Sequence, residues 1–236
     1  MSSRIIIVTG ASRGIGRETV RVFSEMGCTV LATARTQEDL LSLKRETGCY
    51  ILSGDIGEVS FVRRLFAYQN TLGRLACLVN NAGISHFSLL QDTSLDDWNR
   101  ILNTNVTSMF LTCREAIPAM LQAGGGSIVN VSSVWGAEGA SCETAYSASK
   151  GAVNALTRAL ARELAPSGIR VNAAAFGAID TAMNDVLTGE DRRDLEAEIG
   201  MGRMGTPREA ATLIVDLALN HPYLTGQIVT MDGGWM

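Results

Sequence analysis

The amino-terminal stretch constrains the fold of this chain more than any other part. Arg4–Thr9 is a continuous run dominated by β-branched residues, which is typical of a strand buried on both faces of a parallel sheet. Gly10, Gly14 and Gly16 follow at once, and a helical pattern then runs through Met26. In such a strand–turn–helix unit the glycines permit a tight turn, a close approach of backbone to phosphate, and packing of helix on strand. The free N–H groups of the helix start favour an anion, so this stretch predicts a nucleotide-phosphate site.

The remaining chain alternates strand and helix patterns, as an α/β fold does. Further strands are predicted at 28–34, 49–53, 76–79, 127–131, 170–175 and 227–231, and further helices at 36–47, 58–72, 97–123, 144–166 and 207–219. No repeat, linker or low-complexity segment interrupts the pattern, so we expect residues 1–236 to form a single domain. The stretch from about 176 to 205 shows no strand pattern. A connection of that length more often has a function than merely joins two elements, so we predict a lid over the substrate there.

Composition excludes several functional classes. The net charge is −4 and no basic cluster is present, so we expect neither a nucleic acid nor a membrane as partner. The five cysteines are odd in number and widely spaced, without a C-x-x-C pair. This argues against a disulfide framework and a zinc site, and it favours a reducing, cytoplasmic compartment. We expect no metal, and the apolar run at residues 5–8 is too short for a signal peptide or membrane span.

The end of the second predicted strand indicates which dinucleotide is bound. Sites that prefer NAD place an acid about 20 residues after the glycine turn, where it binds the ribose 2′-hydroxyl. Here Ala34 holds that place, Arg35 follows it, and Arg13 lies inside the glycine turn. Two guanidinium groups fit a 2′-phosphate, since arginine binds phosphate in a bidentate manner. The alternative is that both are solvated surface residues. We predict that NADP(H) is preferred over NAD(H).

Polar residues follow two more predicted strands at the edge that faces ligand in open parallel sheets. Asp55 and Ile56 end one strand, and the sequence from Asn80 to Gly83 ends another. Asp55 could accept a hydrogen bond from an adenine amino group, or it could equally cap the helix that starts near Glu58.

Tyr146 and Lys150 provide a possible proton-transfer pair. Residues four apart lie on one face of a helix, about 6 Å apart along its axis. Tyrosine alone is a poor acid or base near neutrality because its pKa is about 10, but a neighbouring ammonium lowers that pKa. Ser133, at the end of another predicted strand, could hold a carbonyl or hydroxyl oxygen against the phenol.

Asn105 lies in the interior of a predicted helix, where it is either structural or kinks the helix and holds a water.

Together these motifs resemble the short-chain dehydrogenase/reductase family. The resemblance rests on Thr9-Gly-x-x-x-Gly-Ile-Gly16, Asn80-Asn-Ala-Gly83, Asn105, Ser133, Tyr146-x-x-x-Lys150 and the closing Thr225-Gly-Gln…Asp232-Gly-Gly234, and it covers essentially the whole chain. It is strongest to the 3-oxoacyl-acyl-carrier-protein reductase branch. The family implies a doubly wound Rossmann fold, with a seven-stranded parallel sheet and helices on both faces. It also implies a homotetramer, or a dimer, built partly on the helices at 98–123 and 144–166.

The resemblance assigns roles to individual residues. Tyr146 would be the general acid in reduction, Lys150 would lower its pKa and bind the nicotinamide ribose, and Ser133 would hold the substrate oxygen. Asn105 would hold a water that links Lys150 to solvent. The cofactor site would consist of Gly10, Ser12, Arg13, Gly14, Ile15, Gly16, Arg35, Asp55, Ile56, Asn81, Ala82, Gly83, Tyr146, Lys150, Gly177, Ile179 and Thr181. Asn81 to Gly83 would line the adenosine side, and Ile179 and Thr181 would meet the nicotinamide carboxamide and the phosphates.

Two departures from the family bear on the substrate. Relatives usually have Pro-Gly where this chain has Phe176-Gly177, so the floor of the nicotinamide site could be looser or differently shaped. Between Glu115 and Thr157 the one cation is Lys150, whereas an acidic acyl carrier would be steered by positive charge. The positive charge for such a carrier could still come from Arg114, Arg162 and Arg203.

We therefore predict an NADP(H)-dependent 3-oxoacyl-thioester reductase. The alternative is an enzyme for a free ketone or secondary alcohol, such as a sugar or steroid, and a remote alternative is a non-catalytic dinucleotide-binding protein. Ser133, Tyr146, Trp135 and His86 are the candidate substrate contacts, although a lone histidine such as His86 is more often an ordinary loop residue.

Overall fold

The computed structural model, which describes residues 4–184 and 187–236, contains a seven-stranded parallel sheet in the order β3-β2-β1-β4-β5-β6-β7. The strands are β1 (Arg4–Thr9), β2 (Thr29–Ala34), β3 (Tyr50–Ser53), β4 (Arg74–Asn80), β5 (Gly126–Ser133), β6 (Ile169–Phe176) and β7 (Ile228–Met231). The order reverses at β1, which lies between β2 and β4. This is the topological switch point, where open α/β sheets bind ligands beyond the carboxyl ends of their strands.

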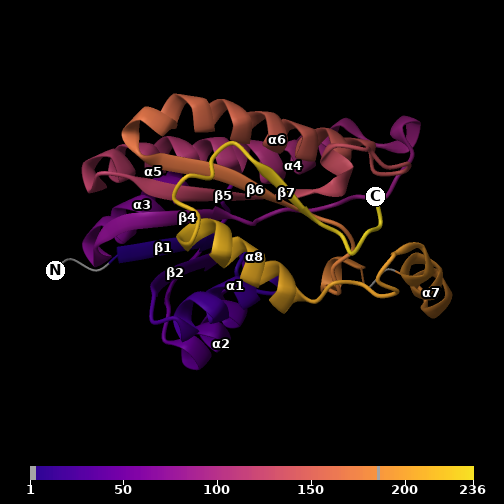
Figure 1. The fold of residues 1–236 in the computed structure, drawn as a ribbon, viewed down its shortest axis with the longest axis horizontal. Coiled ribbons are helices and arrows are strands. Elements are labelled where there is room, and N and C mark those ends of the chain that lie inside the picture. Colours follow the sequence, from indigo (N-terminus) through magenta and orange to yellow (C-terminus); the bar gives the residue numbers. More distant parts are fainter. Residues whose placement is uncertain (1–3, 185–186) are drawn as a thin grey trace.

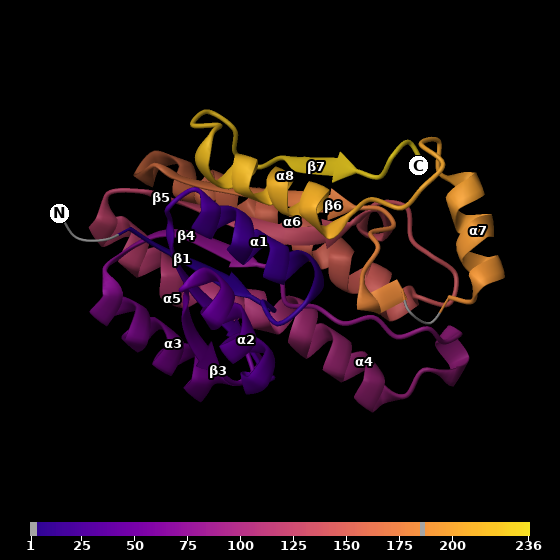
Figure 2. The same ribbon diagram turned by 90° about the horizontal axis from the view of Figure 1, so that it is seen from below.

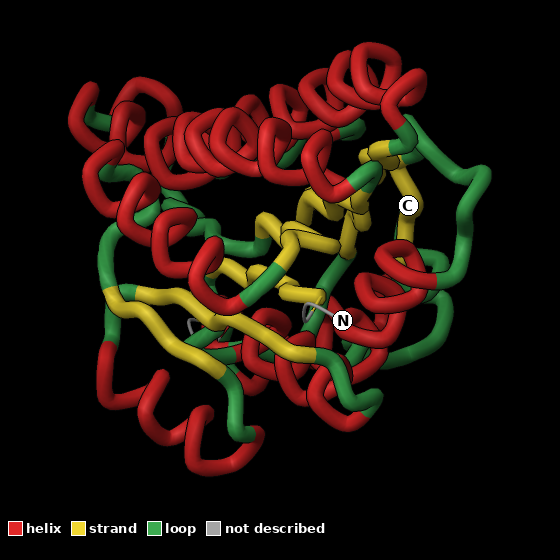
Figure 3. The backbone as a smooth tube through the Cα atoms, turned by 90° about the vertical axis from the view of Figure 1, so that its left-hand side faces the viewer, coloured by secondary structure: helices red, strands yellow, loops and turns green. Residues whose placement is uncertain are grey.

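Helices cover both faces of the sheet (Figures 1 and 3). One face carries α1 (Gly14–Glu25), α2 (Gln37–Thr47) and α8 (Pro207–Leu219), and the other carries α3 (Val59–Leu72), α5 (Ser108–Ala123) and α6 (Thr144–Leu164). Figure 2 shows α1 and α8 side by side across the sheet, with α4 (Leu95–Leu102) and α7 (Gly189–Glu198) toward one end. The seven-stranded, doubly wound prediction is confirmed.

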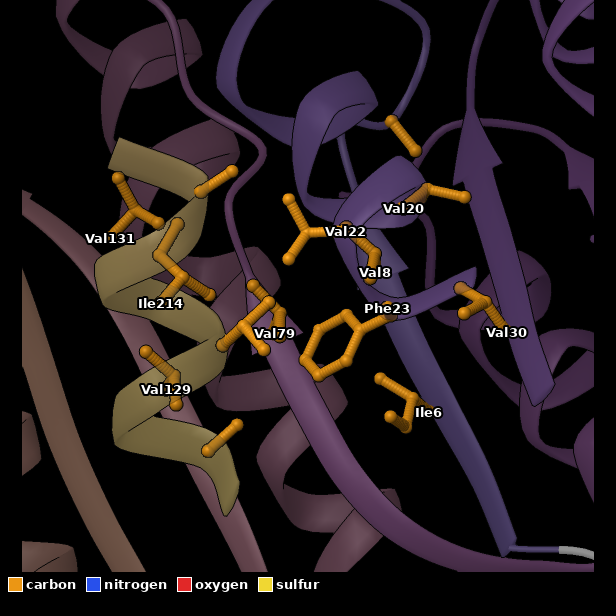
Figure 4. Packing of buried hydrophobic residues seen from close by; sticks show 14 of the residues in the cluster. Ile6, Val8, Val20, Val22, Phe23, Val30, Val79, Val129, Val131 and Ile214 are labelled. Atoms are coloured by element: carbon orange, nitrogen blue, oxygen red, sulfur yellow. The ribbon is translucent and has the colours of Figure 1, made fainter. Parts of the chain in front are cut away.

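The core beneath α1 fixes the position of the glycine turn. Phe23 of α1 lies among Ile6 of β1, Val79 of β4 and Ile214 of α8, and all four side chains are buried (Figure 4). Burial of each such side chain contributes roughly 1.5–3 kcal/mol. These contacts hold α1 against β1, β4 and α8, and this gives the glycine turn that precedes α1 a rigid support.

The helix predicted over 97–123 is not continuous, and this is the largest difference from the predicted elements. It begins two residues earlier, because Ser94 caps α4 by accepting from the N–H of Asp97 at 3.0 Å. Between α4 and α5 the backbone forms a π-helical turn over Asn103–Thr107, in which the N–H of Ser108 bonds the carbonyl of Asn103. Such turns insert one extra residue into a helix, often at functional sites. Asn105 lies in this turn and is fully buried.

Phe176, the residue that replaces the expected proline, is the last residue of β6. It is paired with Ser133 of β5 and Met231 of β7, and its ring is buried in the core with Ile179. Sheet pairing on both sides and burial of the ring therefore hold this position without a proline, and they do not support the expectation of a looser floor.

The predicted lid leaves the sheet after Phe176 and returns to its own starting point. Ile179 and Gly205 form an isolated parallel bridge, in which the N–H of Asp180 donates to the carbonyl of Gly205 at 2.8 Å and the N–H of Gly205 donates to that of Ala178 at 2.9 Å. Between them α7, none of whose residues is buried, stands at the edge of the molecule near the C-terminus (Figure 1). The predicted range 176–205 includes 185–186, which lie outside the described residues.

Candidate active site

The ends of β1 and β4 are joined through the side chain of Thr9. Its hydroxyl donates to the carbonyl of Val79 at 3.3 Å and accepts from the N–H groups of Asn81 at 3.0 Å and Ala82 at 3.1 Å. Thr9 is buried, so these bonds are shielded from water. The glycine turn and the Asn80–Gly83 segment are thereby held together at the switch point.

The side chain of Asn81 supports the glycine turn and does not lie free beside an adenosine. Its amide donates to the carbonyls of Thr9 at 2.9 Å and Gly10 at 3.1 Å. A Cβ on Gly16 would lie 2.3 Å from the Gly10 oxygen and 2.4 Å from the Asn81 amide nitrogen, so only glycine fits at this position. Both donors of the Asn81 amide therefore serve the fold, and the contact of Asn81 to Gly83 with the adenosine stays a prediction.

The turn itself forms a cradle that fits dinucleotide phosphates. Gly10 and Gly14 have φ angles of +65° and +54°, in the left-handed region that favours glycine. No side chain caps the start of α1, so its first N–H groups are free to bind an anion. Thr181 faces this turn from the lid, since a Cβ on Gly14 would lie 3.3 Å from its Cγ2. Phosphate groups would thus lie between the turn and the first residues of the lid.

The arginines near the turn fall into two groups. Arg17 is committed to the fold, because its guanidinium donates to the carbonyls of Ser12 and Asp39 and to the Glu46 carboxylate. Arg13 and Arg35 are exposed, and within residues 4–184 and 187–236 neither side chain makes a hydrogen bond or ion pair. Both guanidinium groups predicted to read the 2′-phosphate are therefore available to a ligand.

The two interpretations of Asp55 fare differently. Its Oδ1 accepts from the N–H of Gly57 at 2.8 Å, whereas the N-cap of α3 is Glu58, so the capping interpretation is wrong. The residue is exposed, and no residue among 4–184 and 187–236 bonds its second carboxylate oxygen. Ile56 and Ile179 are both buried in the core, so a contact of either residue with the cofactor stays a prediction for the backbone. Ile15 packs partly against the core as well.

Lys150 is a buried ammonium with a single acceptor among the residues that the structure describes. Its Nζ donates to the carbonyl of Val131 at 2.8 Å, and the residue is 3 % exposed. Burial lowers its pKa to about 8, since no carboxylate compensates the charge. Nζ also lies 5.4 Å from the centre of the Tyr146 ring. Two of its three N–H donors therefore remain for a ligand on the same side as the phenol.

The pKa of Tyr146 is not lowered in this structure, contrary to the sequence-based expectation. Burial raises it, the negative charge of Glu143 raises it further, and a hydrogen bond with Ser133 opposes these effects. The Lys150 ammonium lies over the ring, 5.4 Å from its centre, and does not outweigh the effect of burial on this pKa. The phenol therefore keeps its proton and can act as a proton donor, with Ser133 at the end of β5 as its neighbour.

Asn105 links the Gly83 loop to the helix that carries Tyr146. Its amide donates to the carbonyl of Ile84 and to the Ser149 hydroxyl, each at 2.9 Å, and its Oδ1 accepts from the N–H of Ile84 at 2.8 Å. Ser149 in turn donates to the carbonyl of Tyr146 at 2.6 Å. Both amide donors are therefore occupied by protein groups. A water held by Asn105 would have to bind its Oδ1 or main-chain carbonyl, not the amide N–H groups.

Trp135 follows Ser133 by two residues, and its backbone N–H donates to the Ser133 hydroxyl at 3.3 Å. It packs edge-to-face against Trp235 of the C-terminal segment, with ring centres 4.9 Å apart. The indole N–H of Trp235 donates to Glu198 at the end of α7, at 3.3 Å. Through Trp235 the C-terminal segment thus contacts both α7 and Trp135. His86 follows Ser85 in the loop after Gly83, with its Nε2 3.9 Å from a carboxylate oxygen of Asp97 in α4, and its contact with the substrate stays a prediction.

Neither a metal site nor a membrane segment is found in the described part of the chain. Residues 4–184 and 187–236 contain no group of three or more His, Cys, Asp or Glu side chains that could hold a metal ion. Over the same ranges no helix is long and apolar enough to cross a membrane.

A crevice of about 520 Å³ opens at the amino-terminal ends of the strands, where Arg170 donates to the carbonyls of Leu217 and Ala218 in α8. None of Ser133, Tyr146 and Lys150 lines this crevice.

Comparison with known proteins identifies the family. The family model for short chain dehydrogenases matches residues 4–192, so this chain belongs to that family of oxidoreductases. It is 37% identical over 243 residues to the 3-oxoacyl-[acyl-carrier-protein] reductase of Thermotoga maritima, covering 99% of this chain and 98% of that protein. It is 38% identical over 234 residues to the human protein of the same name, covering 98% and 97%. A crystal structure of a putative gluconate dehydrogenase from Agrobacterium tumefaciens superposes with a TM-score of 0.94 at 31% identity, covering 99% and 96%.

Several residues that organise the site were not among the predicted site residues. They are Thr9, Ser85, Glu143, Ser149 and Trp235. Glu143 and Ser149 each lie three residues from Tyr146 on α6 or at its start, so helical spacing could have indicated them. The contributions of Ser85 and Trp235 depend on tertiary contacts between segments that are distant in sequence.

Proposed function

We propose that this protein is an NADP(H)-dependent reductase of 3-oxoacyl thioesters. The observation that carries the proposal is the cluster of Ser133, Tyr146 and Lys150 at the carboxyl edge of the sheet, beside an uncapped glycine turn. The similarity to 3-oxoacyl-[acyl-carrier-protein] reductases supports the thioester as substrate.

In this proposal each residue has a defined task. The Ser133 hydroxyl holds the substrate carbonyl oxygen against the phenol, and Tyr146 donates its proton to that oxygen as reduction proceeds. The nicotinamide, when bound, supplies the hydride. Lys150 binds the nicotinamide ribose through its two open N–H donors, and its charge stabilises the phenolate left after proton transfer. Asn105 positions the Gly83 loop and α6 relative to each other.

The preference for NADP(H) rests on Arg13 and Arg35, whose guanidinium groups flank the turn and have no described protein partner. Ala34 offers no carboxylate for a ribose 2′-hydroxyl. A 2′-phosphate would therefore find two cations and no acid on the residues that face it.

A free ketone or secondary alcohol is the second candidate substrate, for two reasons. The cations near the site are few: Arg203 is paired with Glu209 at 2.7 Å, and Arg114 stacks on Phe110 of α5. Trp135, two residues after Ser133, is also bulky, and its ring packs on that of Trp235. The protein therefore offers little unpaired positive charge to attract an acidic carrier protein.

The experiment compares NADPH with NADH as reductant for acetoacetyl-coenzyme A and for a panel of free ketones and sugars. The proposal expects NADPH-dependent turnover of the thioester at a higher kcat/KM than any free carbonyl. Turnover of free ketones alone would move the protein to the second candidate, and no turnover of any carbonyl would refute both.

We further propose a single-domain protein that assembles as a homotetramer, or a dimer, in a cytoplasmic, thiol-reducing compartment. Phe110 and Leu121 lie on one face of α5 and are half exposed, which favours a contact with a second copy. The five cysteines are all free. Light scattering coupled to gel filtration should give a mass of two or four chains, and a monomer would contradict the assembly.

A further inference from the structure

Glu143 is an acidic group of the catalytic cluster to which the proposed chemistry assigns no task. It directly precedes α6 and lies three residues before Tyr146, near enough that its charge acts on the phenol. The side chain is half-buried. A carboxylate there opposes formation of the phenolate, so its presence needs another explanation than proton transfer.

The carboxylate is held in a defined place. The hydroxyl of Ser85 donates to its Oε1, and Ser85 follows directly on Ile84, whose backbone both donates to and accepts from Asn105. Ser88 forms an isolated parallel bridge with Glu143, through an N–H that donates to the carbonyl of Cys142 at 2.7 Å. Glu143 is therefore fixed between the loop after Gly83 and the start of α6, and this loop begins beside Lys150, because a Cβ on Gly83 would lie 3.6 Å from its Nζ.

The second carboxylate oxygen has no partner among residues 4–184 and 187–236, and no cation pairs with the group there. The one cation between residues 115 and 157 is Lys150, which donates to Val131. A half-buried carboxylate with an open oxygen binds a hydrogen-bond donor well and repels an anion.

We propose that Glu143 determines substrate specificity: it accepts a hydrogen bond from a donor group near the reacting carbonyl and excludes substrates that carry an anionic group there. In a thioester substrate the donor would be an amide N–H of the thiol arm. In a free carbonyl substrate it would be a hydroxyl or ammonium group. The inference rests on the proposed carbonyl reduction, and it selects the substrate class within it.

The test uses three acetoacetyl thioesters that differ only in the thiol arm. One carries an N-acetylcysteamine arm with an amide N–H, one a butyl arm, and one a mercaptopropionate arm with a carboxylate. The native protein should prefer them in that order in kcat/KM. Glu143→Gln keeps an acceptor for Ser85 but removes the charge, so the anionic thioester should gain about 10-fold relative to the butyl thioester. Glu143→Ala should abolish the preference for the amide arm over the butyl arm.

Glu138→Gln is the matched control, because Glu138 is an exposed carboxylate on the turn before α6. It should leave all three ratios within about 2-fold of the native values. The Kd for NADPH, measured by fluorescence, should be unchanged in every variant, which separates specificity from a folding defect. Equal effects of Glu143→Gln on the neutral and anionic thioesters, or equal shifts in the control, would overturn the inference.

Failure of the thioester proposal gives a different result. If no thioester is reduced, the same ratio is measured with ethyl acetoacetate against acetoacetate as free ketones. A change of about 10-fold in that ratio in Glu143→Gln would uphold the role of Glu143 while refuting the thioester as substrate. An unchanged ratio would refute the role of Glu143 as well.

Discussion

Replacing Asn105 with alanine tests how the site is held together. The side chain makes three hydrogen bonds, two with Ile84 and one with Ser149, and it is fully buried. Each bond contributes about 1 kcal/mol net, so Asn105→Ala should lower the free energy of unfolding by about 3 kcal/mol. Any cavity left at the π turn would add to this loss.

The assay is equilibrium unfolding in urea at one fixed protein concentration, since assembly would couple stability to concentration. Asn103→Ala is the matched control, because Asn103 is an exposed asparagine of the same π turn. It should cost less than about 0.5 kcal/mol. Ser149→Ala, which removes one of the three bonds and the bond from Ser149 to the Tyr146 carbonyl, should cost about 2 kcal/mol. A loss below about 1 kcal/mol in Asn105→Ala would refute the view that Asn105 joins the loop to α6.

Three further predictions follow from the site. Arg35→Asp should lower kcat/KM for NADPH at least about 10-fold more than for NADH, and equal losses would contradict the 2′-phosphate assignment. The pKa of Lys150 falls from 10.5 to about 8 on folding, so the unfolded chain binds more protons between these values, and stability should rise with pH across that window. Urea unfolding at pH 7.5 and 10 should show a smaller rise in Lys150→Met, and an unchanged rise would assign the effect to other groups. The Ser132 hydroxyl donates to Asn154 on α6 at 2.7 Å, and this bond joins α6 to the end of β5. Asn154→Leu should therefore lower kcat about 10-fold while the Kd for NADPH changes less than 2-fold. A native kcat would show that this bond does not position α6.

The fold was predictable because local patterns and global topology agree. The run of apolar residues in β1 and the glycines that follow it could form little else, and the alternation of strand and helix patterns then fixed the sheet. The boundaries were less certain: β4 begins at Arg74, two residues before the predicted start, and β5 extends through Ser133. Such ends depend on pairing with neighbouring strands, which one segment does not specify alone.

The break between α4 and α5 was harder to predict, because the apolar spacing on both sides of it is helical. The π turn places the Asn105 side chain within hydrogen-bond distance of Ile84 and Ser149. Both partners come from segments that are distant in sequence, so the local pattern does not reveal them. The pKa of Tyr146 was mispredicted for a similar reason. The sequence shows that Lys150 lies one turn away, but not that its ammonium lies over the ring, nor that Glu143 faces the phenol.

The most direct test of the central claim is a single-turnover reaction in which NADPH consumption is followed by absorbance, with acetoacetyl-coenzyme A as substrate and Tyr146→Phe as the variant. If Tyr146 donates the proton, the variant should bind NADPH with a native Kd while hydride transfer slows at least about 100-fold, in keeping with the usual contribution of a positioned acid. Hydride transfer at the native rate in Tyr146→Phe would contradict the account.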